Sequence, residues 1–153
     1  MVKKRIKGAL MASLLAALSL GLMMAFVDRK SQWYQSLMKS PFQPDASGML
    51  AAWMVMYFLL AVAFFWTMER GMRGRGLYAY LLHFAALPLY SYLFFATRNP
   101  ITAAIALFCG IVTALLAAFW SAEYSRVAAW LWVPHIGWLA LVMVFCYAIV
   151  MLN

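Results

Sequence analysis

Long apolar runs separated by polar stretches dominate the pattern of hydrophobic and polar positions. Five runs cover residues 8–27, 49–68, 77–96, 101–121 and 128–152. A helix needs about 20 apolar residues to cross the hydrocarbon core of a bilayer, so each run is long enough to span a membrane. The pattern predicts an all-α integral membrane protein, with residues 1–153 forming one five-transmembrane-helix bundle.

The connectors differ in length and in character. Three are short, which makes consecutive helices antiparallel, whereas residues 28–48 form a long loop that contains WYQSLMKSPFQPD. Prolines restrict the backbone of this loop, and Trp33, Tyr34, Leu37 and Phe42 supply apolar surface to lay back on the bundle. We therefore expect a structured loop between the first two helices. The first run also resembles a signal peptide, but it is longer than the usual core and lacks a small-x-small site before Asp28, which favours an uncleaved span.

Composition supports the membrane interpretation. The chain is 68% hydrophobic and only 10% charged, whereas soluble proteins average about half apolar and a quarter charged residues. The net charge of +8 comes from basic residues placed between the apolar runs. Such residues mark membrane boundaries rather than a nucleic-acid surface, so we expect a lipid bilayer and no nucleic acid as a partner.

The distribution of Lys and Arg predicts the orientation. Eight of them flank one side: Lys3, Lys4, Arg5, Lys7, Arg70, Arg73, Arg75 and Arg126. The other side has four: Arg29, Lys30, Lys39 and Arg98. The positive-inside rule then places the N-terminus in the cytoplasm. The 28–48 loop is expected on the opposite side, in the periplasm if the membrane is a bacterial inner membrane.

Small residues recur at every fourth position in two runs. They are Ala9, Ser13, Ala17, Gly21 and Ala25 in the first, and Thr102, Ala106, Gly110, Ala114, Ala118 and Ala122 in the fourth. Small residues let helices approach closely in lipid. One ladder is expected to serve packing within the bundle and the other a homodimer, and the sequence does not say which does which. The alternative is that both ladders serve only packing within the bundle, since alanine is common in membrane helices.

Ionisable residues are almost absent from the spans, which argues against proton-coupled transport and acid–base hydrolysis. The exceptions are His83 and His135. They could ligate a haem as a pair, although hydrogen bonding to a neighbouring helix is the simpler interpretation. Cys109 and Cys146 form no metal-ligand spacing and are interpreted as small core residues. No metal site is expected.

Aromatic residues carry the strongest functional signal, with 7 Trp, 8 Tyr and 11 Phe. Trp53 and Tyr57 share one helix face, as do His135 and Trp138. Pro88 and Pro134 free backbone groups and can open space between helices. A bundle lined by such rings suits a flat aromatic or sterol-like ligand. Interfacial belts and ordinary core packing would give much of the same pattern.

Residues 33–57, WYQSLMKSPFQPDASGMLAAWMVMY, resemble the hallmark of the TspO/MBR family, the tryptophan-rich sensory proteins related to the mitochondrial translocator protein. The family pattern is WYxxLxKPxxxPPxxxxxxxWxxLY, and seven residues match it in register: Trp33, Tyr34, Leu37, Lys39, Pro44, Trp53 and Tyr57. HFAALPLYSYLFF resembles the family's QLxLNxxWSxxFF, and PHIGWLALVMVFCYAIVMLN resembles PYLxWxxFAxxLNxxxxxxN. The resemblance covers essentially the whole chain.

Several positions depart from the family pattern: Ser40 and Asp45 replace prolines, His83, Leu87 and Tyr90 replace Gln, Asn and Trp, His135 replaces Tyr, and Cys146 replaces Asn. The chain therefore looks like a divergent member. Leu87 cannot form the polar ligand contact associated with the family's Asn, and the two loop changes imply a looser lid.

The resemblance implies a membrane receptor or sensor that binds porphyrins, haem or related tetrapyrroles, with no obligatory cofactor, in an aromatic pocket under the loop. The expected ligand-binding residues are Trp33, Tyr34, Phe42, Pro44, Trp53, Tyr57, His83, Leu87, Tyr90, His135 and Trp138. The alternatives are an enzyme that promotes light- and oxygen-dependent protoporphyrin breakdown through Trp53 and Trp138, or a small transporter or scaffold for a hydrophobic ligand.

Overall fold

The computed structural model describes residues 2–153, and their side chains from Ile6 onward. It contains α1 (Val2–Ala25), α2 (Gln32–Ser36), α3 (Ala46–Glu69), α4 (Arg75–Ser91), the π-helix η1 (Tyr92–Ala96), α5 (Pro100–Tyr124) and α6 (Arg126–Leu152), and no strand within those residues. Five segments of the described chain are long and apolar enough to span a membrane: Ile6–Ala25, Ala46–Glu69, Arg75–Ala96, Pro100–Tyr124 and Arg126–Leu152. The predicted fold class is confirmed.

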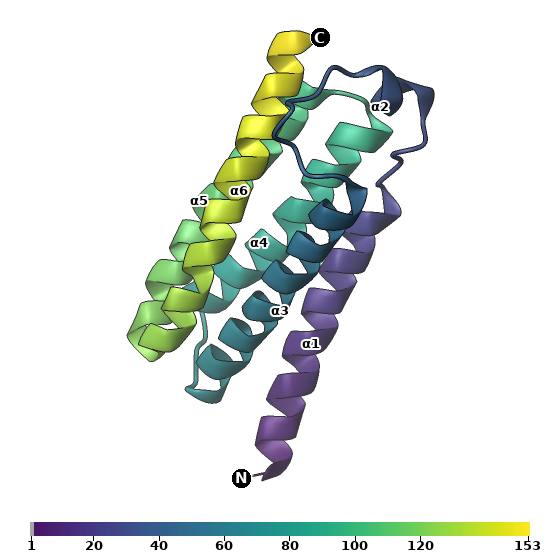
Figure 1. Cartoon of the computed structure of the whole chain (residues 1–153). Coiled ribbons are helices and arrows are strands. Elements are labelled where there is room, and N and C mark those ends of the chain that lie inside the picture. The colour runs from purple at the N-terminus through teal and green to yellow at the C-terminus, as the bar shows by residue number, and fades with distance from the viewer. Residues whose placement is uncertain (1) are drawn as a thin grey trace.

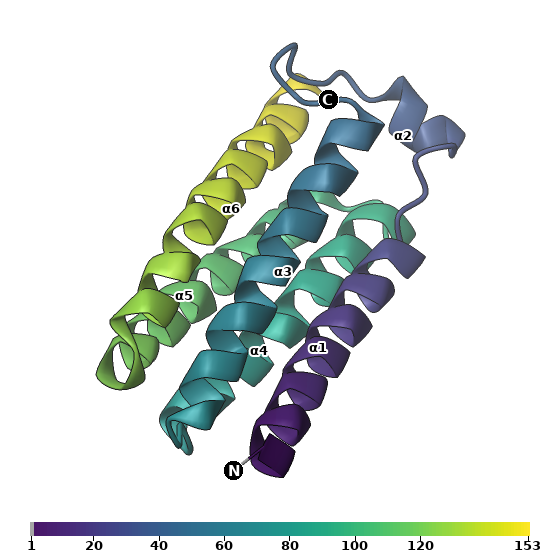
Figure 2. The ribbon, with the colours of Figure 1, turned by 60° about the horizontal axis from the view of Figure 1, so that its bottom comes forward.

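The spanning helices form a closed ring (Figures 1 and 2). Its order is α1, α3, α6, α5, α4 and back to α1, because each of these neighbouring pairs is in contact. The chain runs back and forth across the bundle, so the N-terminus and the C-terminus lie at opposite ends. The 28–48 loop crosses the end that holds the C-terminus (Figure 1). The side chains of Lys3, Lys4 and Arg5, which contribute to the predicted orientation, lie outside the described side chains.

Local sequence signals set the helix ends at the loop side. Asp45 caps α3, where one carboxylate oxygen accepts from the Gly48 N–H at 2.8 Å and the other from the Ser47 hydroxyl at 2.7 Å. These bonds lower the pKa of the exposed Asp45 carboxyl, with a smaller contribution from Arg29. A carboxylate at this position is also stabilised by the positive end of the helix dipole. The residue that replaces a family proline therefore fixes the start of α3.

The two ladders of small residues have different places. In α5, Ala106, Gly110 and Ala114 are buried in the bundle, and a Cβ added at Gly110 would lie 3.6 Å from the Leu87 side chain. In α1, most of the ladder is exposed, and a Cβ added at Gly21 would meet nothing within 4 Å. The α5 ladder thus serves packing within the bundle, while the α1 ladder lies on the outer surface.

The two cysteines also differ. Cys146 is buried, as expected, whereas Cys109 is exposed on the outside of α5, so its interpretation as a core residue is wrong. α5 is apolar around its whole circumference, because lipid covers the side that water would cover in a soluble protein. Hydrophobicity therefore could not distinguish the two faces.

The 28–48 loop is held by its own hydrogen bonds and by the end of α6. The Lys39 ammonium donates to the carbonyls of Tyr34 at 2.6 Å and Leu37 at 3.1 Å, and it lies 4.3 Å from the centre of the Tyr34 ring. The Asn153 side chain accepts from the Met38 N–H at 2.9 Å and donates to the Met38 carbonyl at 3.1 Å. The loop is structured as predicted.

Phe42 does not pack on the bundle, contrary to the expectation from the sequence. It follows Pro41 at the tip of the loop and is 86% exposed. The hydrogen bond from the Gln43 N–H to the Ser40 carbonyl closes a tight turn there, which points the intervening side chain outward.

Candidate functional site

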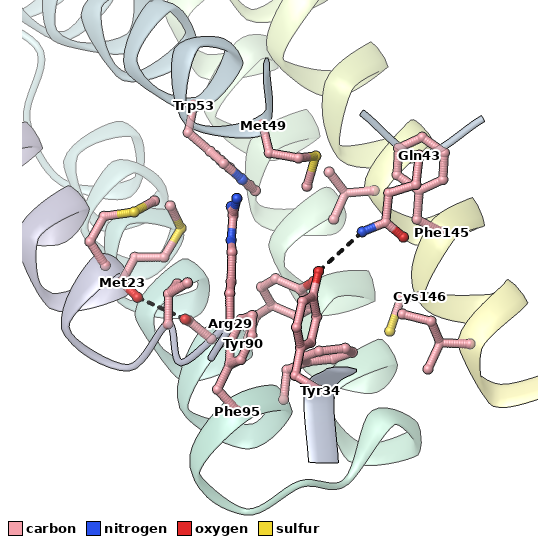
Figure 3. A pocket seen from close by; sticks show the side chains of 16 residues that line it. Met23, Arg29, Tyr34, Gln43, Met49, Trp53, Tyr90, Phe95, Phe145 and Cys146 are labelled. Carbon is pink, nitrogen blue, oxygen red and sulfur yellow. Dashed lines mark hydrogen bonds between the residues drawn. The ribbon is translucent and has the colours of Figure 1, made fainter. Parts of the chain in front are cut away.

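A small cavity lies inside the bundle at the loop end (Figure 3). Its free volume is about 50 Å³, and its lining comes from α1, the loop, α3, α4 with η1, and α6. The lining residues are Met23, Met24, Val27, Arg29, Tyr34, Gln43, Met49, Trp53, Tyr90, Ser91, Phe94, Phe95, Val142, Phe145, Cys146 and Ile149. Ligand sites usually offer roughly 300–1,000 Å³, so the cavity as it stands is too small for a drug-sized ligand.

The π-helix η1 shapes the inner wall. The Thr97 N–H donates to the Tyr92 carbonyl, five residues back, at 3.2 Å. This wider turn brings Phe94 and Phe95 to the cavity, where their ring centres lie 4.9 Å apart. π-turns inside helices often occur at functional sites.

The loop closes the cavity through Tyr34. Its ring packs on Phe95, with centres 5.4 Å apart, and its hydroxyl accepts from the Gln43 amide at 3.4 Å. Trp33 packs edge-to-face on Phe94 at 5.6 Å. The aromatic pair that opens the hallmark thus attaches the loop to η1.

Four cavity residues also line a larger depression on the outside of the loop. Arg29, Tyr34, Gln43 and Met49 belong to both, and the outer depression has a volume of about 320 Å³. These four side chains therefore form the partition between the cavity and the surroundings. We call this group the mouth of the cavity.

Trp53 forms the wall opposite η1. It is buried and meets Trp138 of α6 edge-to-face, with ring centres 5.8 Å apart. Trp138 does not line the cavity itself, and its buried indole N–H has no hydrogen-bond partner among the described residues. The two tryptophans expected to take part in porphyrin breakdown are therefore in direct contact.

Comparison with known proteins agrees with the hallmark. The model of the TspO/MBR family matches residues 10–152. The chain belongs to the TspO/MBR family. Two proteins called tryptophan-rich protein TspO are similar to it. The one from Archaeoglobus fulgidus is 27% identical over 148 residues, which cover 94% of this chain and 96% of the relative. The one from Bacillus cereus is 27% identical over 124 residues, which cover 79% and 80%.

Of the residues predicted from the TspO/MBR resemblance to bind a ligand, Tyr34, Trp53 and Tyr90 line the cavity. Pro44 lines the outer depression, and Trp33 and Trp138 support the cavity wall from behind. Phe42 lies at the exposed loop tip. These placements leave ligand contact itself a prediction.

Tyr57 and Leu87 lie elsewhere in the core. The Tyr57 hydroxyl and the Ser19 hydroxyl share a hydrogen bond of 2.9 Å, and Ser19 also donates to the Phe84 carbonyl at 2.6 Å. Tyr57 therefore joins α3 to α1 and α4. Leu87 is fully buried and faces Gly110 of α5, so it fills space between helices rather than the cavity.

His83 and His135, two departures from the TspO/MBR pattern, meet each other. Their Nε2 atoms are 2.8 Å apart, and His83 Nδ1 lies 3.0 Å from the Gly110 carbonyl. The expected hydrogen bond to a neighbouring helix is confirmed. A metal held between two imidazoles needs bonds of about 2 Å to each nitrogen, which this spacing does not allow, so the haem-ligating pair does not fit this arrangement.

Sequence reasoning missed most of the other cavity residues, above all Arg29 and Gln43. On α6, Val142, Cys146 and Ile149 continue the face of Trp138 at helical spacing, and that continuation could have revealed them. Loop residues follow no such period, so the sequence gives no signal for Arg29 beyond its charge. No three His, Cys, Asp or Glu side chains gather as a possible metal site within the part of the chain that was searched.

Proposed function

We propose that this TspO/MBR member is a membrane receptor or sensor that binds a porphyrin, haem or related tetrapyrrole in the cavity under the 28–48 loop. The observation that carries the proposal is the aromatic cavity itself, in which Tyr34, Trp53 and Tyr90 come from the hallmark and from the family-like part of α4. Flat, mostly apolar ligands bind well between such rings.

Binding requires the cavity to expand, because its present volume of about 50 Å³ holds no tetrapyrrole. The 28–48 loop is the element that can open it. The loop contacts the bundle through the Tyr34 and Trp33 rings and through Asn153, rather than through a covalent or charged link. We infer that the loop is a lid which lifts for the ligand and closes over it.

Fluorescence titration with protoporphyrin tests this proposal. We expect saturable quenching of tryptophan fluorescence in the wild-type protein, and binding weakened roughly threefold to tenfold by Trp53→Phe, since an aromatic contact contributes on the order of 1 kcal/mol. Trp138→Phe should weaken binding as well, because Trp138 supports Trp53.

Trp130→Phe is the matched control, because Trp130 lies on α6 like Trp138 and is 71% exposed. It should leave affinity unchanged. If Trp53→Phe and Trp138→Phe bind as the wild type does, the cavity is not the porphyrin site.

The contact between Trp53 and Trp138 favours one alternative, the light- and oxygen-dependent breakdown of protoporphyrin. A bound pigment beside two oxidisable rings needs no acid–base residue for this chemistry. Product formation that exceeds the rate with an unrelated membrane protein, and that is lost in both phenylalanine variants, would support the enzyme. Transport of a hydrophobic compound into vesicles, without porphyrin affinity, would instead support a transporter or scaffold.

We also propose a homodimer and an N-terminus on the cytoplasmic side of a bacterial inner membrane. The exposed small residues of α1 offer a face on which a second helix can pack closely. The surplus of Lys and Arg on the side of the N-terminus supports the orientation.

A further inference from the structure

We propose that Arg29, assisted by Gln43, forms a carboxylate-binding subsite at the mouth of the cavity, which selects flat hydrophobic ligands that carry an acid group at one edge. The inference deepens the proposed function and rests on it. Tetrapyrroles with free carboxylate side chains belong to this ligand class, and their esters do not.

Arg29 lies at the boundary between the cavity and the outer depression. Its side chain is half-buried and belongs to the partition between the cavity and the outer depression. In Figure 3 the side chain extends along the cavity toward the Trp53 wall. A ligand that enters between the loop and the bundle must pass this guanidinium.

The guanidinium of Arg29 has free N–H donors. It makes no hydrogen bond to any other residue in the part of the chain whose side chains are described. Two acidic residues lie near it. Asp45 already accepts from Gly48 and Ser47 at the start of α3, and the chain neighbour Asp28 accepts from the N–H groups of Lys30 and Ser31. A guanidinium offers five N–H donors in a fork that matches a carboxylate.

Lys39, the basic residue that lines the outer depression together with Arg29, is committed elsewhere. The Lys39 ammonium donates to two loop carbonyls and lies over the Tyr34 ring. Lys39 therefore maintains the loop, which leaves Arg29 as the cation that can receive an anionic ligand at the mouth.

Gln43 supplies an independent observation. Its side-chain oxygen is buried and has no hydrogen-bond partner among the residues whose side chains are described, and its amide N–H reaches Tyr34 only at 3.4 Å. A buried polar atom without a partner is costly, so the closed mouth is incomplete. Rotation of the Gln43 side-chain amide by half a turn exchanges the positions of its oxygen and its nitrogen. The NH2 group would then be a second donor to a carboxylate held by Arg29.

The location also suits a ligand with one charged edge. The mouth lies at the end of the bundle where the loop meets α3, whereas the cavity behind it is lined by Trp53, Phe94 and Phe95. A carboxylate is expensive in hydrocarbon and inexpensive at the interface. The ligand would bind with its acid edge at Arg29 and its macrocycle between the rings.

The test compares protoporphyrin with its dimethyl ester on the full-length protein. We expect the wild type to prefer the free acid, and Arg29→Gln to weaken acid binding roughly tenfold to a hundredfold, as for loss of a charge-assisted hydrogen bond. Ester binding should not change. Arg29→Lys should retain part of the preference, since it keeps the charge but loses the fork.

Lys30→Gln is the matched control, because it removes one positive charge from an exposed neighbouring position. It should bind both compounds as the wild type does. Equal weakening of acid and ester by Arg29→Gln, or no change in either, would overturn the subsite, and unfolding temperatures verify that each variant is folded.

A second probe separates this inference from the proposed function. If the wild type binds neither porphyrin form, the proposed function fails, and pyrenebutyrate with its methyl ester then tests the subsite alone. Preference for the free acid that depends on Arg29 would uphold the subsite, while equal affinity for acid and ester would overturn it.

Discussion

At the scale of single residues, the histidine pair has a defined protonation pattern. The Gly110 carbonyl can only accept, so a neutral His83 carries its proton on Nδ1. Its Nε2 then accepts, and His135 donates from Nε2 across the 2.8 Å contact. His135 Nδ1 is left buried without a partner among the described residues. The pair therefore links α4, α5 and α6 through a single ordered arrangement.

We expect His135→Leu to destabilise the protein by about 1–2 kcal/mol, because the His83 acceptor loses its partner in the core. His83→Leu should cost a similar amount. In the double variant His83→Leu with His135→Leu, the loss should be smaller than the sum of the two, since no unpaired group remains. Unfolding in detergent by chemical denaturant measures the three values, and additive losses would show that the imidazoles do not depend on each other.

Residues in the hallmark were easier to predict than those outside it. Tyr34 and Trp53 of the hallmark line the cavity, and so does Tyr90, which stands where the family pattern has Trp. The histidine contact was not predictable as a pair, because it depends on how α4 and α6 are rotated about their axes, and the apolar runs do not encode that rotation. From the sequence, Arg29 contributed only to the predicted orientation in the membrane. Its place at the cavity could not be predicted, because a loop residue follows no helical periodicity.

At the scale of elements, length and apolarity predicted the five spans well. The ends differ by a few residues: α1 begins at Val2 rather than at residue 8, because basic residues continue the helix beyond the apolar run. η1 could not be predicted, since its sequence YLFFA is compatible with an ordinary α-helix. Pro88, one turn earlier, is the only local signal of an irregular backbone.

Gly110 and Gly21 provide a matched pair of substitutions in the two ladders. We expect Gly110→Leu to destabilise the bundle by about 1–3 kcal/mol, because the added side chain must displace Leu87. Gly21→Leu should lower the unfolding midpoint less than Gly110→Leu does, since the space around Gly21 within one chain is open.

If the α1 ladder forms the proposed dimer, Gly21→Leu should also reduce the mass measured by light scattering from that of two chains to that of one. A wild-type protein that is monomeric, or a Gly21→Leu variant that remains dimeric, would remove α1 from that role.

At the scale of the whole molecule, the ring of helices is closed at one end by a loop that the C-terminal residue Asn153 helps to position. The loop leaves α1, contacts η1 through Trp33 and Tyr34, and is held by Asn153 at the end of α6. The lid is therefore coupled to three helices, although few interactions hold it.

Asn153→Ala should make the lid open more often. Two hydrogen bonds to the Met38 backbone are lost, and each contributes about 1 kcal/mol. We expect hydrogen exchange at the Met38 amide to accelerate about tenfold or more, and porphyrin association to become faster. Gln35→Ala is the control, because Gln35 is an exposed loop residue whose side chain makes none of the hydrogen bonds described. Unchanged exchange in Asn153→Ala would mean that the loop is held by its aromatic contacts alone.

The position of Asn153 has a practical consequence for anyone who handles this protein. An affinity tag or fluorescent reporter fused after Asn153 would begin beside the lid. It would interfere with the two hydrogen bonds between the Asn153 side chain and the Met38 backbone. A fusion at the N-terminus lies at the opposite end of the bundle (Figure 1). Porphyrin affinities measured on the two kinds of fusion should differ for this reason. The N-terminal fusion is the one that leaves the lid undisturbed.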